Sequence, residues 1–111
     1  IQAAAIVALT GPQACLREMC ELYQHRRDLI VEALRAIGMQ CTAPRATIYV
    51  WAKVPEGETS ESFTTKLLEQ AHVVVTPGSG YGPDGEGYIR ISLTTPDDRL
   101  LEAVRRIKES M

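Results

Sequence analysis

The chain has 111 residues, 45% of them hydrophobic, and carries a formal net charge of -2. This length and composition suit one domain with an ordinary hydrophobic core, and they argue against a disordered, collagen-like or membrane-embedded protein. Basic residues are interleaved with acidic ones instead of forming a basic face, which argues against a nucleic-acid partner.

The chain opens with an apolar run from Ile1 to Leu9, without an initiating methionine or any preceding basic residue. The run is too short to span a bilayer and lacks the charged start of a signal peptide. We therefore expect the chain to begin inside a helix of a longer protein. Gly11 and Pro12 interrupt the run and separate it from the next element.

Between Leu16 and Ile37, apolar residues recur three or four positions apart with charged residues between them. This spacing predicts a long amphipathic helix that packs on one side, is solvated on the other, and ends at Gly38.

From Pro44 the hydrophobic period changes to two, which predicts a strand that ends at Pro55. One face carries Ile48, Val50, Ala52 and Val54, and the other carries Thr47, Tyr49, Trp51 and Lys53. We expect Tyr49 and Trp51 to pack the sheet against a helix; the alternative is that they line a binding pocket.

Ser60 and Glu61 predict the cap and the first turn of a further helix. Its apolar positions are Phe63, Leu67, Leu68 and Ala71. A short apolar strand over residues 73–75 follows in the prediction and stops at Pro77.

Residues 77–87 hold five of the eight glycines, and we expect no regular structure there. Tyr88 to Leu93 alternates again, which predicts a strand, and Thr95 and Pro96 predict the cap and first position of a last helix. Its inner face would be Leu100, Leu101, Val104 and Ile107. This order of elements predicts an α+β fold, a two-layer sandwich in which helices cover a small antiparallel or mixed sheet.

Few residues suggest chemistry. The three cysteines have neither CxxC spacing nor a histidine cluster, so we expect reduced, partly buried thiols and no metal site. His25 and His72 are expected to be structural or solvent-facing. The segment from Gly78 to Pro83 is only superficially similar to a phosphate loop, because a strand and not a helix follows it.

Arg90 follows the glycine-rich loop, between Ile89 and Ile91, which face the core. A guanidinium offers five donors and suits a planar carboxylate bidentately, and the loop glycines allow a close approach of a backbone or a ligand. The supporting glycines are Gly78, Gly80, Gly82 and Gly87. These features indicate an anion-recognition arginine at the mouth of a cleft; the alternative is a solvated arginine paired with Asp84 or Glu86.

The run from Pro77 to Leu93, with the upstream segments Tyr23 to Asp28 and Pro44 to Pro55, resembles class I/II aminotransferases of fold type I over essentially the whole chain. Residues 82–94 are most similar to the LL-diaminopimelate aminotransferases, enzymes of lysine biosynthesis. The resemblance implies that residues 1–10 are the end of the large domain or a connecting helix, and that residues 11–111 form the carboxyl-terminal small domain. It also implies that Arg90 binds the α-carboxylate of the substrate.

The resemblance further implies a pyridoxal 5'-phosphate cofactor in the parent enzyme, held by a Schiff-base lysine and other residues of the large domain. Lys53, Lys66 and Lys108 match no such motif, so we expect the chain alone to hold no catalytic residue, bind no cofactor and be inactive. The implied parent is a cytoplasmic homodimer that acts on an amino acid and a 2-oxo acid.

Two alternatives stay open. One is a stand-alone α+β regulatory module whose loop over residues 78–87 binds a small ligand. The other is a pyridoxal-phosphate-dependent synthase or lyase with the same small domain.

Overall fold

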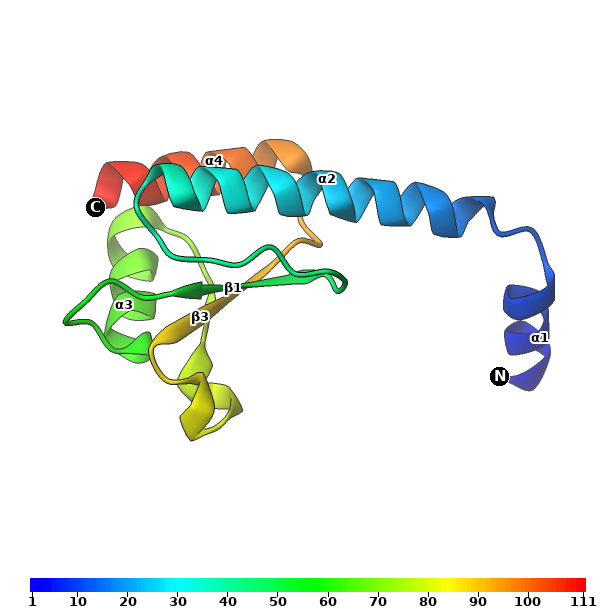
Figure 1. Ribbon diagram of the computed structural model, residues 1–111, viewed down its shortest axis with the longest axis horizontal. Coiled ribbons are helices and arrows are strands. Elements are labelled where there is room, and N and C mark those ends of the chain that lie inside the picture. Colours follow the sequence, from blue (N-terminus) through cyan, green and yellow to red (C-terminus); the bar gives the residue numbers. More distant parts are fainter.

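The structure is a computed structural model that describes residues 1–111. Three strands form one sheet, in which β3 (Tyr88–Ser92) is central and pairs antiparallel with both β1 (Tyr49–Lys53) and β2 (Thr76–Pro77). All helices except the amino-terminal one pack against one face of this sheet (Figure 1), which confirms the two-layer α+β architecture. The elements in chain order are α1 (Gln2–Thr10), α2 (Ala14–Ala36), β1 (Tyr49–Lys53), α3 (Ser60–Lys66), the π-helical turn η1 (Leu67–Ala71), β2 (Thr76–Pro77), the 3-10 turns η2 (Gly78–Tyr81) and η3 (Pro83–Gly85), β3 (Tyr88–Ser92) and α4 (Asp97–Ser110).

A single hydrophobic core lies between the sheet and the helices. The two-residue period of the strands points Val50 and Ala52 of β1 and Ile89 and Ile91 of β3 into this core, as expected. The helices contribute their own apolar rows: Ile30, Val31 and Leu34 from α2, Phe63 from α3, Leu67 and Ala71 from η1, and Leu100 and Ile107 from α4. Fully burying a valine, leucine, isoleucine or phenylalanine side chain stabilises the fold by roughly 1.5–3 kcal/mol.

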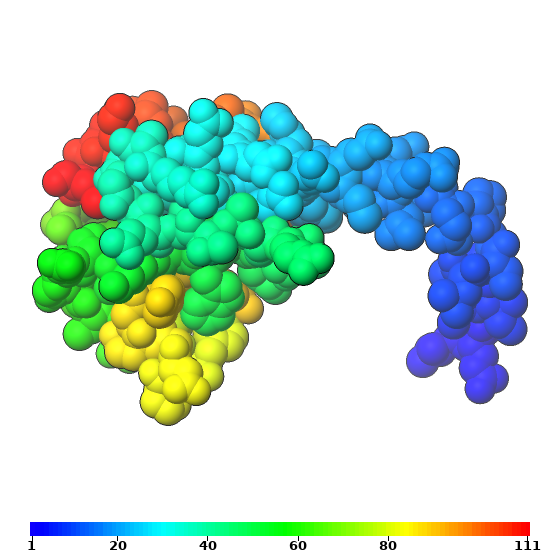
Figure 2. Space-filling model, viewed as in Figure 1, coloured from blue at the N-terminus to red at the C-terminus, as the bar shows by residue number.

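The amino-terminal part of the chain stands clear of the core. No residue of α1 is buried, and Leu16 in the first turns of α2 is 57% exposed. The radius of gyration is 16.2 Å, whereas a compact chain of this length would have about 13 Å. Figure 2 shows α1 and the start of α2 projecting from the rest of the molecule. The expectation that the whole of α2 packs on one side is therefore wrong for its first half.

The cap of α3 differs from the prediction by one residue. Thr59 is the N-cap, because its Oγ1 accepts a hydrogen bond from the Ser62 backbone N at 3.0 Å while the Ser62 Oγ accepts one from the Thr59 N at 2.9 Å. This reciprocal pair is a capping box with serine at its third position. Ser60 lies inside the first turn and is fully buried. Leu68, which we expected in the core, is exposed.

The short strand β2 lies at residues 76–77 and not at 73–75. His72 adopts a left-handed conformation with φ 54°, which ends η1 and redirects the chain, and Val74 faces solvent. Pro77 is compatible with β2 because this is an edge strand, where a missing N–H breaks no ladder. The glycine-rich segment also departs from the prediction, since it forms the regular turns η2 and η3.

The last helix begins at Asp97, one residue later than predicted, with Pro96 as its N-cap. Arg26 of α2 ties this start in place, because its Nε donates to Asp97 Oδ1 at 2.6 Å and its Nη1 donates to the Leu93 carbonyl at 3.1 Å. Leu101 is exposed, in contrast to the prediction.

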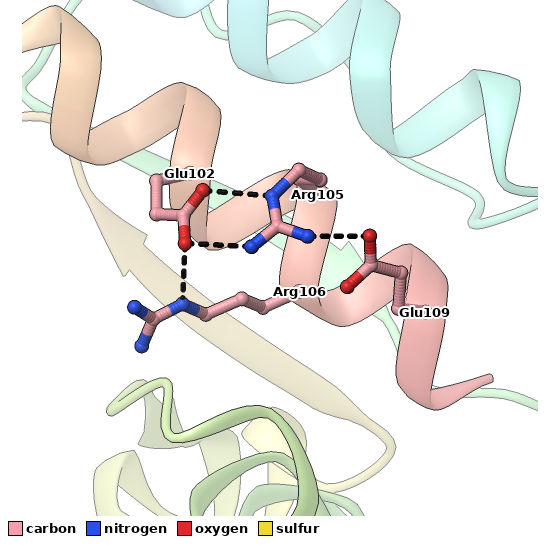
Figure 3. Close-up of polar contacts among 4 residues, drawn as sticks. All are labelled: Glu102, Arg105, Arg106 and Glu109. Atoms are coloured by element: carbon pink, nitrogen blue, oxygen red, sulfur yellow. Dashed lines mark hydrogen bonds and ion pairs between the residues drawn. The ribbon is translucent and has the colours of Figure 1, made fainter.

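The outer face of α4 carries a network of charged side chains. Glu102 accepts hydrogen bonds from Arg105 and from Arg106, and Arg105 also pairs with Glu109 (Figure 3). These residues lie three or four positions apart, so they are neighbours on the helix surface.

None of the helices combines the length and the apolar character needed to cross a membrane.

Candidate functional site

The second face of the sheet carries the residues of the candidate site. Strand alternation places Arg90 of β3 on the face opposite to the core, and the register sets it between Trp51 of β1 and Thr76 of β2. Arg90 therefore lies on the central strand, with a neighbouring strand on each side.

Aromatic rings surround the Arg90 guanidinium. Its Cζ lies 4.0 Å from the ring centroid of Tyr49 and 4.7 Å from that of Tyr81. Both distances are within the range of cation–π attraction. Tyr49 comes from β1 and Tyr81 from the end of η2, so the pairing strand and the glycine-rich loop both contribute to the surroundings of Arg90.

No carboxylate lies within 4.0 Å of Arg90, and its Nε is buried without any hydrogen-bond partner. Leaving such a donor unsatisfied costs free energy, and the cost is greater for a charged group. The arginine thus keeps an uncompensated positive charge and an unused donor, which are the properties of a group that receives an anion.

The alternative pairing of Arg90 with Asp84 or Glu86 does not occur. The Glu86 carboxylate accepts hydrogen bonds from the backbone N and the Oγ of Ser60, both at 2.8 Å. These bonds hold the pKa of Glu86 below its ordinary value, and the bond from the Ser60 backbone has the largest effect. Asp84 is exposed and forms no ion pair. Neither acid of the loop therefore pairs with the arginine.

The loop glycines differ in what they do. A Cβ on Gly78 would lie 1.9 Å from the Gly85 carbonyl oxygen, and one on Gly85 would lie 2.1 Å from the Gly78 carbonyl oxygen, so the two turns cross in close contact. Gly82 and Gly87 have φ values of 109° and 80°, which favour glycine. Gly80 has open space around its Cα and no such φ.

Gly85 was not among the predicted loop glycines, although the Pro83-Asp84-Gly85 sequence is a turn signal that could have indicated it.

Tyr49 and Trp51 lie on the sheet face opposite to the core, so the expectation that they pack the sheet against a helix of the core is wrong. The Trp51 side chain is 38% exposed and meets the Tyr81 ring edge-on, with centroids 5.5 Å apart and an interplanar angle of 70°. A hollow beside this pair is lined by Trp51, Tyr81, Asp84, Gly85 and Tyr88. Arg90 lies outside that lining, so this hollow is not the cleft predicted at Arg90.

The remaining candidates offer no catalytic arrangement. His25 is exposed and lies 3.7 Å from Asp97 Oδ2, and His72 is exposed at the end of η1. No group of three histidine, cysteine or acidic side chains could hold a metal ion. Cys15 and Cys20 are exposed, in contrast to the expected partial burial, because they lie on the projecting half of α2. Cys41 is half-buried, with its Sγ 3.7 Å from the Val31 carbonyl.

The three lysines do not form a site either. Lys66 pairs with Glu58 at 3.6 Å, and Lys53 and Lys108 are exposed. The feature of this chain that suits anion binding is the guanidinium of Arg90, which has no acidic partner.

Comparison with known proteins gives a consistent family match. The family described as Aminotransferase class I and II matches residues 1–107. An LL-diaminopimelate aminotransferase of Dehalococcoides mccartyi is 57% identical over 107 residues, which cover 96% of this chain and 28% of that protein. The chain thus spans about 28% of the length of the curated relatives it matches.

Solved structures give the same match. The substrate-bound structure of BacF from Bacillus subtilis has a TM-score of 0.90 and 38% identity, covering 97% of this chain and 28% of that chain. The aspartate aminotransferase from Rhizobium meliloti has a TM-score of 0.85 and 42% identity, covering 98% of this chain and 30% of that chain.

Proposed function

Since the chain belongs to the class I and II aminotransferase family, we propose that it is the carboxyl-terminal small domain of a pyridoxal-phosphate-dependent aminotransferase. The parent enzyme transfers an amino group between an amino acid and a 2-oxo acid. The names of the relatives favour LL-diaminopimelate as the amino acid, and therefore a role in lysine biosynthesis. The family also favours a cytoplasmic homodimer.

The observation that carries the proposal is the state of Arg90. Its guanidinium is held on the central strand without an acidic partner, and its Nε is an unsatisfied buried donor. A guanidinium in this state favours a planar carboxylate, which every amino acid and every 2-oxo acid carries. We assign Arg90 the role of binding the substrate α-carboxylate, with the loop glycines Gly78, Gly80, Gly82 and Gly87 as the segment that supports it.

In this role Arg90 orients the substrate. Binding the carboxylate at a fixed point restricts the α-carbon, and such positioning lowers the barrier by converting an encounter into an intramolecular step. The carboxylate also satisfies donors of the guanidinium that are otherwise unused.

The lysines of this chain do not fit the cofactor. Lys66 pairs with Glu58, and Lys53 and Lys108 are exposed. We therefore assign the residues that hold pyridoxal phosphate, and the electron sink that it supplies, to a large domain outside this chain. No step through the cofactor is assigned to residues of this chain.

The proposed domain boundary lies at the end of α1. Residues 1–10 are the end of the large domain or a connecting helix, and residues 11–111 are the small domain. The absence of any buried residue in α1 supports this division, because an apolar helix of this kind needs a surface outside the 111 residues to pack on.

Arg90→Ala in the full-length enzyme tests the proposal. We expect kcat/KM for the amino acid to fall about 30- to 1000-fold, the equivalent of losing ~2–4 kcal/mol from a desolvated charge pair. Cofactor absorbance should not change. Arg90→Lys should give an intermediate value, because an ammonium lacks the planar fork of a guanidinium. Wild-type kinetics in Arg90→Ala would remove Arg90 from the site.

Two measurements separate the proposal from its alternatives. Calorimetric titration of the 111-residue chain with amino acids should show negligible binding, whereas a regulatory module would bind one of them. Product analysis on the full-length enzyme should show an exchanged amino group, whereas a synthase or lyase would form or break another bond.

A further inference from the structure

Tyr81 brings the glycine-rich loop into contact with Arg90. Its ring centroid lies 4.7 Å from the Arg90 Cζ, and Trp51 of β1 contacts the same ring edge-on. The Tyr81 side chain is nonetheless 50% exposed. Burial of its apolar ring therefore does not by itself explain why Tyr81 lies against the unpaired arginine.

An aromatic partner has a property that an acidic partner lacks. The ring attracts the cation through its quadrupole but carries no net charge, so it holds the guanidinium without neutralising it. A carboxylate in the same place would compete with an incoming anion. Since Glu86 is bonded to Ser60 instead, the loop contributes a ring and not an acid to the surroundings of Arg90.

The loop is built to keep Tyr81 in place. The backbones of Gly78 and Gly85, which lie before and after Tyr81 in the chain, are in close contact and hold η2 against η3. The buried Ser60 Oγ accepts a hydrogen bond from the Ser79 backbone N at 3.3 Å and donates one to Glu86 at 2.8 Å. Both ends of the loop are therefore attached to the first turn of α3.

We propose that Tyr81 is a positioning residue for Arg90: its ring orients the guanidinium for the substrate carboxylate, and the glycine-rich loop serves to hold this ring. The inference rests on the proposed function, in which Arg90 binds the α-carboxylate. It assigns the loop the task of presenting a side chain, and not of binding a phosphate or another ligand with its backbone.

The test uses the full-length holoenzyme with Tyr81→Phe, Tyr81→Leu and Tyr81→Met. The phenylalanine variant keeps the ring and should have KM values within about twofold of the wild type. The two variants without a ring should raise KM for both the amino acid and the 2-oxo acid about five- to thirtyfold, with a smaller change in kcat. This factor matches the strength of a partly desolvated cation–π contact.

A second readout separates positioning from a general loss of structure. The ratio of kcat/KM for the amino acid to that for its α-carboxamide measures how well the site recognises the negative charge. Loss of the ring should lower this ratio about five- to thirtyfold, whereas damage to the fold would lower both numbers together. Tyr88→Leu, at another exposed tyrosine of the same sheet face, is the matched control and should leave the ratio unchanged.

The outcomes test the positioning role of Tyr81 separately from the carboxylate-binding role of Arg90. If Arg90→Ala lowers the ratio and the ring-free Tyr81 variants do not, the positioning role is wrong and the carboxylate anchor stands. If Arg90→Ala also leaves the ratio unchanged, the proposed function of Arg90 fails as well. An equal effect of Tyr81→Phe and Tyr81→Leu would assign the effect to the hydroxyl and overturn the inference.

Discussion

Gly78→Ala perturbs the contact between the two turns of the glycine-rich loop. The added methyl carbon would lie 1.9 Å from the Gly85 carbonyl oxygen and 2.7 Å from the Tyr88 carbonyl oxygen. Both neighbours are backbone atoms, so no flexible side chain can swing away. The two turns would have to separate by about 1 Å before the contact became tolerable, which is a severe form of overpacking.

The magnitude follows from this geometry. Overpacking typically costs about 1–3 kcal/mol, and a clash between two backbones belongs at the upper end, so we expect a loss of about 3 kcal/mol. Gly80→Ala is the matched control: Gly80 contributes only its backbone to the same loop, nothing lies within 4 Å of its ideal Cβ, and its φ is not positive. This control should be neutral or stabilising by up to about 1 kcal/mol.

Urea unfolding of the full-length protein, followed by circular dichroism, measures the difference between the two variants. The midpoint of Gly78→Ala should be clearly lower than that of Gly80→Ala. Because the displaced turn carries Tyr81, KM should also rise in Gly78→Ala and stay near the wild-type value in Gly80→Ala. Equal urea midpoints in Gly78→Ala and Gly80→Ala would refute the close backbone contact between Gly78 and Gly85.

Two further predictions concern backbone strain and pH. Thr47 has a φ of 84°, which is strained for a residue other than glycine. Thr47→Gly should raise the melting temperature, because it relieves about 1–2 kcal/mol of strain and the added conformational entropy of the unfolded chain costs less than that. The control Thr42→Gly relieves no such strain and should lower the melting temperature. Arg105 and Arg106 lower the pKa of Glu102 to about 2, so its stabilisation is present above about pH 4.5 and is lost as pH falls towards 2. The melting-temperature difference between wild type and Glu102→Gln should therefore be constant from about pH 5 to 8 and shrink below about pH 4.5; a constant difference down to pH 2 would contradict the ion pairs.

Strands β1 and β3 were the most predictable part of the fold, whereas β2 was predicted three residues too early. The two-residue period assigned Val50 and Ile89 to the core and Trp51 and Arg90 to the opposite face, and the structure places them there. This worked because successive side chains of a strand point to opposite faces whatever the rest of the chain does.

The helices were predictable in position but not in the extent of their burial. The period of α2 indicates an apolar face along its whole length, yet Leu34 is fully buried and Leu16 is exposed. Periodicity shows which face of a helix is apolar, but only the surrounding elements decide whether anything covers it.

The candidate site was also predictable only in part. The chain order of a glycine-rich segment followed by a strand was enough to single out Arg90 and to indicate the family, because both are local properties of the sequence. The partners of Arg90 were not predictable, since they depend on which distant segments meet. Glu86 is close to Arg90 along the chain, but its carboxylate bonds to Ser60, 26 residues away.

Sequence alone determined the alternation of the strands, the apolar faces of the helices and the position of the arginine on the sheet. Only the tertiary structure decided that aromatic rings and not acids surround that arginine. The physical reason is that side-chain direction follows from the backbone period of a few residues, whereas electrostatic partners are set by contacts between elements that are far apart in the chain.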